Sequence, residues 1–139
     1  MRGIDTNILV RTVDLTDERQ TAAVERLLDE AAAQPLFVNH IVLSEFAWTL
    51  ERRYKRSRAE IAVRLRNILE APDFVVPQPT LVEQAIGAFE ASKAQFPDCL
   101  IGVANLASGC TTTLTFDSDA AEMTLDIRSV AGLLMSRSL

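Results

Sequence analysis

The chain contains few of the residues that build soft-metal sites or disulfide frameworks. Among 139 residues there is one histidine, His40, and there are two cysteines, Cys99 and Cys110. A single histidine excludes a multi-histidine metal site, and the cysteine spacing matches no zinc or redox motif. We expect both cysteines to be reduced thiols in or near the core. His40 and Ser44 lie one helical turn apart, but a hydrolytic triad there is disfavoured, and we expect His40 at a helix start.

Glycine and long apolar runs are also scarce. The five glycines form no P-loop and no dinucleotide-binding fingerprint. No apolar run reaches the roughly 18 residues of a membrane span, because Asp5, Arg11 and Asp14 interrupt the first stretch. The N-terminus has no signal-peptide pattern. We therefore expect a cytoplasmic protein with no membrane segment.

The composition is that of a globular protein, with 48% hydrophobic and 24% charged residues. The length suits one compact domain over residues 1–139, with a loose tail from about residue 132. The net charge is −5, yet half of the 14 basic residues fall in one short segment: Arg52, Arg53, Lys55, Arg56, Arg58, Arg64 and Arg66. Such a basic cluster is either a solvated helical surface or a local attractor for phosphates on an acidic protein.

Strand and helix patterns alternate along the chain. Five strands are expected over short apolar or β-branched stretches: 2–5, 36–38, 74–76, 112–116 and 127–130. Six helical segments are expected between them: 7–13, 17–33, 40–54, 58–71, 80–93 and 97–109. Alternation of this kind predicts an α/β fold, a three-layer α/β/α sandwich with a mostly parallel central sheet.

Polar residues at the helix ends support these boundaries. Thr16 and Ser57 are predicted N-caps of the second and fourth helical segments. Thr80 is predicted to cap the fifth, where Glu83 completes a capping-box pattern. Gly109 is a natural C-cap for the sixth, which Pro97 opens.

Two aspartates follow expected strands at opposite ends of the sequence. Asp5 follows Ile4, and Asp117 follows Phe116. Because ligands bind beyond the carboxyl ends of strands in open parallel sheets, both aspartates are candidate site residues. Each alone is weak evidence, since aspartate is common in turns.

Two further acids lie in apolar helical segments. Glu45 is flanked by apolar residues on nearly every side of its helix, which we expect to be buried, so it is either a site residue or a structural glutamate paired with arginine. Asp98 follows Pro97 at a helix start, where it favours the helix dipole and could also face the sheet edge.

If these four carboxylates meet, their repulsion requires a neutralising cation. Their oxygens suit Mg²⁺ or Mn²⁺. A hard cation that keeps open water positions can activate a water and offset charge on a phosphodiester. The basic cluster, in particular Arg52, Arg53 and Arg56, would then bind flanking backbone phosphates.

Four sequence motifs together resemble the PIN domain, and specifically VapC-type toxins of type II toxin–antitoxin systems. In order they are Ile4-Asp5-Thr6-Asn7-Ile8-Leu9, Leu43-Ser44-Glu45-Phe46, Phe96-Pro97-Asp98-Cys99-Leu100-Ile101 and Leu114-Thr115-Phe116-Asp117. The resemblance runs from Ile4 to about Val130. It implies a magnesium-dependent endoribonuclease that leaves 5′-phosphate and 3′-hydroxyl ends, forms a homodimer and is inhibited by a cognate antitoxin.

The resemblance also implies roles for single residues. Asp5 and Asp98 would bind the metal directly, and Glu45 and Asp117 directly or through water. Thr6 and Asn7 match the small polar pair that positions the first carboxylate and the scissile phosphate, although a plain turn leaving the strand would use the same residues. VapC toxins often carry a basic residue after the fourth acid, whereas this chain has Ser118 and Asp119. Asp119 is either a fifth site acid or the N-cap of a short helix.

Two other functions remain open. A haloacid-dehalogenase-like phosphatase also places an aspartate after its first strand, but it needs a second acid at position 7, which is Asn7, and a late lysine. A non-catalytic PIN-like scaffold would bind RNA or a protein partner without cutting. Metal dependence separates such a scaffold from a nuclease, because a scaffold binds RNA equally well in magnesium and in EDTA and leaves it intact.

Overall fold

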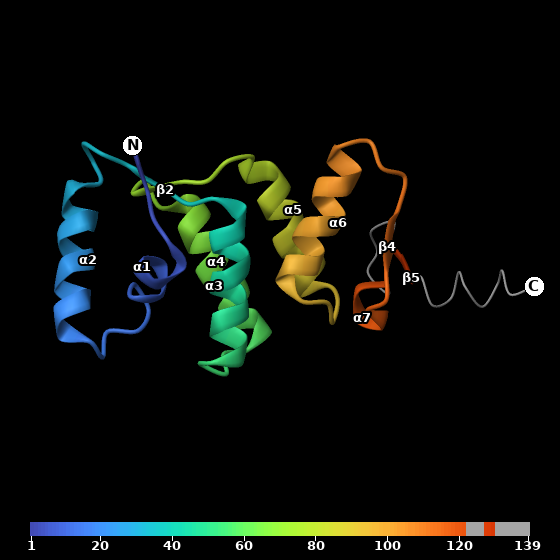
Figure 1. Cartoon of the computed structure of the whole chain (residues 1–139), viewed down its shortest axis with the longest axis horizontal. Helices are drawn as coiled ribbons and strands as arrows, with labels where there is room; N and C mark the ends of the chain where they lie inside the picture. The colour runs from blue at the N-terminus through green and yellow to red at the C-terminus, as the bar shows by residue number, and fades with distance from the viewer. Residues whose placement is uncertain (122–126, 130–139) are drawn as a thin grey trace, which may run out of the picture.

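A computed structural model describes residues 1–121 and 127–129 of the chain (Figure 1). The first half of the described chain contains β1 Arg2–Gly3, α1 Thr6–Val10, α2 Glu18–Glu30, β2 Leu36–Phe37, α3 His40–Arg52 and α4 Arg58–Glu70. The second half contains β3 Phe74–Val75, α5 Pro79–Glu90, α6 Phe96–Ala107, β4 Thr113–Thr115, α7 Ser118–Ala121 and β5 Ile127–Ser129. The α/β class and the alternation of elements are confirmed. The expected loose tail lies outside the described residues.

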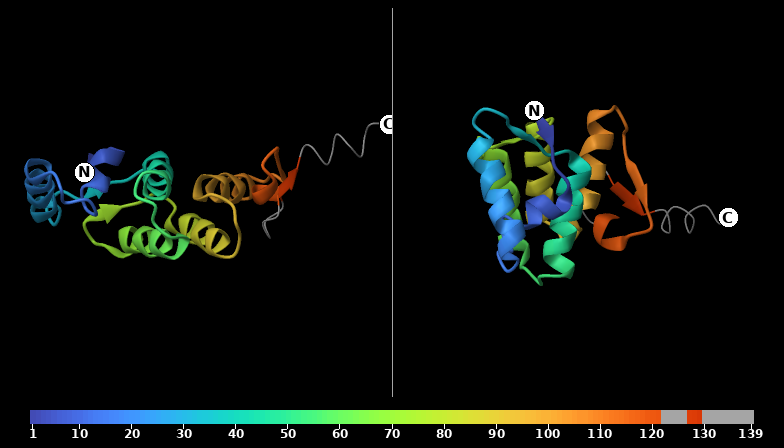
Figure 2. Two further views of the ribbon diagram at one scale, coloured as in Figure 1. Left: turned by 90° about the horizontal axis from the view of Figure 1, so that it is seen from below. Right: turned by 60° about the vertical axis from the view of Figure 1, so that its left-hand side comes forward.

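The strands are parallel, as predicted, but they form two sheets. One sheet has the order β1-β2-β3, with Arg2 opposite Leu36 and Leu36 opposite Phe74. The other contains β4 and β5, with Thr113 opposite Ile127. Figure 2 shows β4 and β5 beyond α6, on the opposite side of α3 from α2. The predicted parallel sheet is thus present as β1-β2-β3, and the fourth and fifth strands pair in a separate sheet.

Two predicted helix caps are corrected by the structure. Asp17, not Thr16, caps α2, and its side chain accepts a hydrogen bond from the Gln20 amide at 2.9 Å. The cap position of α5 is Gln78, which has a φ of 47° and makes no side-chain cap bond. Pro79 supplies the first turn of α5 without needing an amide partner, so Thr80 lies inside the helix.

Ser57 caps α4 as predicted, and Asn39 caps α3. The Ser57 hydroxyl accepts from the Glu60 amide at 3.2 Å. Asn39 accepts from the Val42 amide at 2.9 Å. These caps fix where α3 and α4 begin, and hence which faces of the two helices meet.

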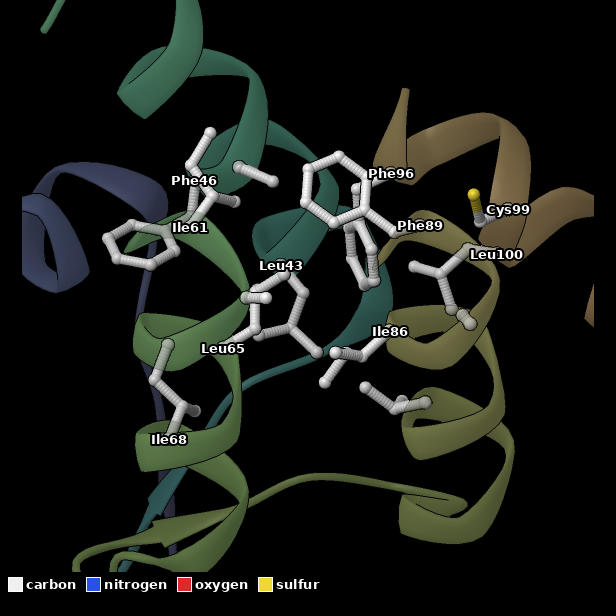
Figure 3. Close-up of a cluster of buried hydrophobic side chains, with 14 of the residues drawn as sticks. Leu43, Phe46, Ile61, Leu65, Ile68, Ile86, Phe89, Phe96, Cys99 and Leu100 are labelled. Atoms are coloured by element: carbon white, nitrogen blue, oxygen red, sulfur yellow. The ribbon is translucent and has the colours of Figure 1, made fainter. Parts of the chain in front are cut away.

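The hydrophobic core lies between α3, α4, α5 and α6 (Figure 3). Leu43 and Phe46 of α3 and Leu65 of α4 are fully buried in it. The rings of Phe89 and Phe96 meet edge to face, with 6.1 Å between centroids and an interplanar angle of 87°. Truncating any one of these side chains is expected to lower the free energy of unfolding by about 2–5 kcal/mol. The cluster therefore fixes the positions of the helices that carry the site.

The two cysteines occupy different environments. Cys99 is buried in α6, and burial raises the pKa of its thiol to about 11. Cys110 is exposed after the end of α6, so the expectation of a core or near-core position is confirmed for Cys99 only. Across residues 1–121 and 127–129, we find no helix with the length and apolar character needed to span a bilayer.

Candidate active site

A hydrogen bond connects Glu45 to Thr6, the residue that follows Asp5. Asp5 ends the extended segment after β1 and caps α1, where its Oδ1 accepts a hydrogen bond from the Ile8 amide at 3.2 Å. The next residue, Thr6, donates its hydroxyl to Glu45 Oε2 at 2.6 Å. Two acids that are 40 positions apart in the sequence thus flank one threonine. The Thr6 hydroxyl is thus bonded to Glu45, and its implied role in positioning the first carboxylate and the scissile phosphate stays a prediction.

The face of α3 that carries Glu45 is exposed, which corrects the prediction of a helix buried all round. Glu45 itself is exposed, and its helical neighbours Ile41 and Trp48 are 69% and 49% exposed. The opposite face, with Leu43 and Phe46, is buried in the core. Glu45 therefore bears no burial penalty, and its hydrogen bond in the structure comes from Thr6 rather than from arginine.

Asp98 and Asp117 form the second pair. Asp98 lies half-buried in the first turn of α6. Burial, and then the negative charge of nearby Asp117, raise the pKa of Asp98 above its ordinary value. Asp117 follows β4, and its Oδ1 accepts from the amides of Asp119 and Ala120 at 2.9 and 3.0 Å. The two acids are close enough to repel each other.

Asp117 caps the start of α7, which decides one of the alternatives for Asp119. Asp119 lies within α7 and is exposed, so its interpretation as the N-cap is wrong. The remaining interpretation of Asp119, a fifth site acid, stays a prediction.

We group the acids as two pairs: Asp5 with Glu45, which are connected through Thr6, and Asp98 with Asp117, whose charges interact. In the described part of the chain, no set of three or more histidine, cysteine, aspartate or glutamate side chains lies close enough to hold a metal ion. Glu45 and Pro97, the residue before Asp98, line the same groove where α3 packs against α6. Each pair offers hard carboxylate oxygens, and Mg²⁺ takes one or two protein carboxylates and keeps several waters. The donor chemistry of each pair therefore fits a hard divalent cation.

The basic cluster divides into exposed and structural members. Arg58 donates to the carbonyl oxygens of Phe89 and Ala94, both at 2.6 Å, and Arg66 forms ion pairs with Glu83 and Glu90. These two side chains stabilise helix packing and are committed to protein partners. Glu83 is thus an ion-pair partner of Arg66 rather than part of a capping box.

Apart from Arg64, which is exposed on α4, the exposed members lie at the end of α3 and just beyond it. The Arg52 guanidinium lies 6.0 Å from the Trp48 ring centroid, and that of Arg53 lies 5.6 Å from the Tyr54 ring. Arg56 forms an exposed ion pair with Glu60 at 3.6 Å. Pairs of this kind are worth little in water, so these cations can exchange their partners for phosphates.

Trp48 is a candidate site residue that the sequence reasoning missed. It lies three positions after Glu45 and four before Arg52, so the three side chains share one face of α3. The spacing was visible in the sequence, but a tryptophan between apolar residues indicates core more often than surface. Only the exposure of this face distinguishes the two.

His40 has a structural role, in agreement with the expected helix-start position. Its Nε2 donates to the Pro77 carbonyl oxygen at 2.6 Å, which ties the start of α3 to the segment before α5. Asn7 is exposed on α1 and lines a pocket together with Asp5.

Comparison with known proteins gives one family. The family model described as the PIN domain matches residues 4–124, which includes both acid pairs. No curated protein matches the chain.

Proposed function

This chain belongs to the PIN domain family, whose members are generally nucleases, and we propose that it is a divalent-metal-dependent endoribonuclease acting as the toxin of a VapC-type toxin–antitoxin pair. The observation that supports the proposal most is the pairing of family-matched acids from distant parts of the chain. Thr6, the neighbour of Asp5, donates a hydrogen bond to Glu45, and Asp98 lies close enough to Asp117 for their charges to interact. We propose that the active unit is the single domain of residues 1–139, working in the cytoplasm.

In this proposal, Asp5, Glu45, Asp98 and Asp117 hold Mg²⁺ or Mn²⁺. When bound, such a cation lowers the pKa of a water molecule and offsets charge on the phosphodiester. Thr6 holds Glu45 in place through its hydroxyl, and the exposed Asn7 amide is positioned to contact RNA beside Asp5. The family match sets aside the phosphatase alternative, whose acid and lysine requirements the sequence also fails to meet.

The test is RNA cleavage by the purified chain in Mg²⁺ and in EDTA. We expect structured RNAs to be cut in Mg²⁺ or Mn²⁺, with 5′-phosphate ends, and to stay intact in EDTA. Intact RNA under both conditions, with equal RNA affinity in both, would support the non-catalytic scaffold instead. Mapping the 5′ ends by ligation distinguishes this hydrolysis from metal-independent cleavage, which leaves 5′-hydroxyls.

Charge reversal at Arg52, Arg53 and Arg56 is expected to weaken RNA binding and flatten its salt dependence. Each phosphate contact to a single strand contributes about 0.7 to the slope of log K against log salt, so loss of three contacts lowers the slope by about 2. Trp48 is the only tryptophan in the chain and lies beside Arg52, so its fluorescence reports binding directly. The binding measurement is repeated between about 50 and 200 mM salt.

The matched control for this experiment is Arg26→Glu, a charge reversal at an exposed position of α2. It changes the net charge without touching the face of α3. If the triple variant keeps the wild-type slope, or if Arg26→Glu lowers it equally, the basic cluster is an ordinary solvated surface.

We also propose that the chain forms a homodimer and binds a cognate antitoxin. A groove between α3 and α6 supports a protein partner, because Ile41 and Ile101 in it are 69% and 52% exposed. Sedimentation velocity tests the dimer, and Ile101→Asp is expected to give monomers. A wild-type chain that sediments as a monomer contradicts it. A short neighbouring gene whose product co-purifies with the chain and stops cleavage is the corresponding test for the antitoxin.

A further inference from the structure

A pocket of about 260 Å³ lies between α1 and α2, next to the proposed catalytic acids. Ile8, Val24 and Leu27 give it apolar walls, and Asn7, Arg11 and Gln20 supply polar groups. Asp5 also lines it, so the pocket opens beside the first acid pair. We call it the α1–α2 pocket.

A hydrogen-bond network fixes the polar side of the α1–α2 pocket. Arg11 donates through Nε to Gln20 Oε1 at 2.6 Å and through one terminal nitrogen to Asp14 Oδ2 at 2.9 Å. Asp14 also accepts from the hydroxyls of Tyr54 and Thr16. These hydrogen bonds hold the pKa of Asp14 well below its usual range, so its charge persists and Arg11 stays anchored. The Arg11 side chain is only 16% exposed, so it forms a fixed wall of the pocket rather than a mobile surface group.

The polar side of the α1–α2 pocket presents side-chain amide groups to a ligand. Gln20 uses its oxygen to accept from Arg11, and its NH₂ group can still donate. Asn7 bonds to Arg11 through its backbone carbonyl, which leaves its side-chain amide available as both donor and acceptor. Side-chain amides of Asn and Gln read the edges of nucleobases, because they present a donor and an acceptor side by side.

We infer that the α1–α2 pocket receives one nucleobase of the RNA, next to the scissile phosphate. The inference rests on the nuclease function proposed above. A base has two apolar faces and a polar edge, and the pocket matches it with apolar side chains and a line of amides. The volume lies below the roughly 300–1,000 Å³ of pockets that enclose drug-sized ligands, which suits a single base. The cleavage rate should then depend on which base occupies one position beside the cut, and Asn7 and Gln20 would select that base.

Binding of nucleoside monophosphates in EDTA tests the pocket without any cleavage. AMP, GMP, CMP and UMP are titrated into the full chain and followed by NMR shifts of α1 and α2. Ala23→Phe is expected to weaken the preferred monophosphate by tenfold or more, because Ala23 lines the pocket at an exposed position of α2 where a larger ring blocks entry. Ala22→Phe is the matched control, since Ala22 is also exposed on α2 but does not line the pocket.

Cleavage of an RNA pool with randomised sequence provides the second measurement. We expect the sequenced ends to show a base preference at one position. Gln20→Leu should lower this preference about tenfold, because it removes one pair of hydrogen bonds to the edge of the base. Ala22→Phe should keep the wild-type preference. The inference is overturned if no monophosphate binds, or if Ala23→Phe leaves the ligand-induced NMR shifts near α1 and α2 unchanged. Absence of cleavage by the wild-type chain in Mg²⁺ and Mn²⁺ overturns the nuclease proposal instead. If the pocket takes a protein side chain, binding of a protein partner rather than of monophosphates will be sensitive to Ala23→Phe.

Discussion

Asp98→Asn and Asp5→Asn are each expected to reduce RNA cleavage by about 100-fold or more. A bound cation supplies several kcal/mol of transition-state stabilisation, and loss of a carboxylate that holds it removes part of this stabilisation. The measurement is kcat/KM on one RNA in Mg²⁺, with RNA affinity in EDTA measured in parallel. Because substrate binding is assigned to other residues, the affinity is expected to change far less than the rate.

The stability of Asp98→Asn separates a site role from a structural one. Burial and the charge of Asp117 raise the pKa of Asp98, so its ionised form is less favourable in the folded chain than in the unfolded chain. A neutral asparagine removes that penalty, and the melting temperature is expected to stay the same or rise while activity falls. A fall in both would make Asp98 a structural acid at the start of α6. Glu70→Gln, at the exposed end of α4, is the control for loss of a carboxylate and should leave the rate unchanged.

Combined variants test whether the two pairs act together. If Asp5, Glu45, Asp98 and Asp117 serve one metal centre, removing one acid from each pair should cost little more than the worse single change. Additive losses would instead indicate two separate sites, which the arrangement of the described residues as two pairs also allows. Thr6→Val removes the hydroxyl that holds Glu45 and is expected to lower the rate with a normal RNA affinity.

Three of the four candidate acids could be found from the sequence because each sits at the end of an element, whereas Glu45 was singled out by its apolar neighbours within a helix. Asp5 and Asp117 follow strands, and Asp98 follows a proline at a helix start, which are all local signals. The link from Thr6 to Glu45 could not be found in this way, because it joins residues 39 positions apart through the packing of α1 on α3. The sequence therefore predicts the members of the pairs, and tertiary packing decides which acid meets which.

The errors in the sequence analysis have the same origin. The pattern of Thr80 and Glu83 is a good local capping signal, but Pro79 begins the helix one residue earlier and Arg66 of α4 recruits Glu83. For α3, apolar residues on all sides gave no means of telling the buried face from the exposed one. That choice depends on where α4, α5 and α6 pack, and it left Trp48 and Ile41 on the surface.

Loss of Arg58 is expected to destabilise the fold strongly, although the sequence groups this residue with the candidate phosphate-binding residues. Its terminal nitrogen donates to the carbonyl oxygens of Phe89 and Ala94, both at 2.6 Å, and its guanidinium lies 3.9 Å from the Phe89 ring centroid. Arg58→Met leaves two partly buried carbonyls without this charged donor. A hydrogen bond to a charged group is worth about 1.5–3 kcal/mol, so we expect a loss of about 3 kcal/mol in the free energy of unfolding.

Thermal and urea melts measure this loss, and one cooperative transition is expected if residues 1–139 form a single domain. For a chain of this size, about 3 kcal/mol lowers the melting temperature by on the order of 10 °C. Arg58→Lys should lose nearly as much, because an ammonium cannot replace the planar guanidinium over Phe89. Arg64→Met, at an exposed position of the same helix, should change stability by less than about 0.5 kcal/mol. If Arg58→Met and Arg64→Met melt together, Arg58 is free to bind RNA, and the division of the basic cluster into structural and exposed members is wrong.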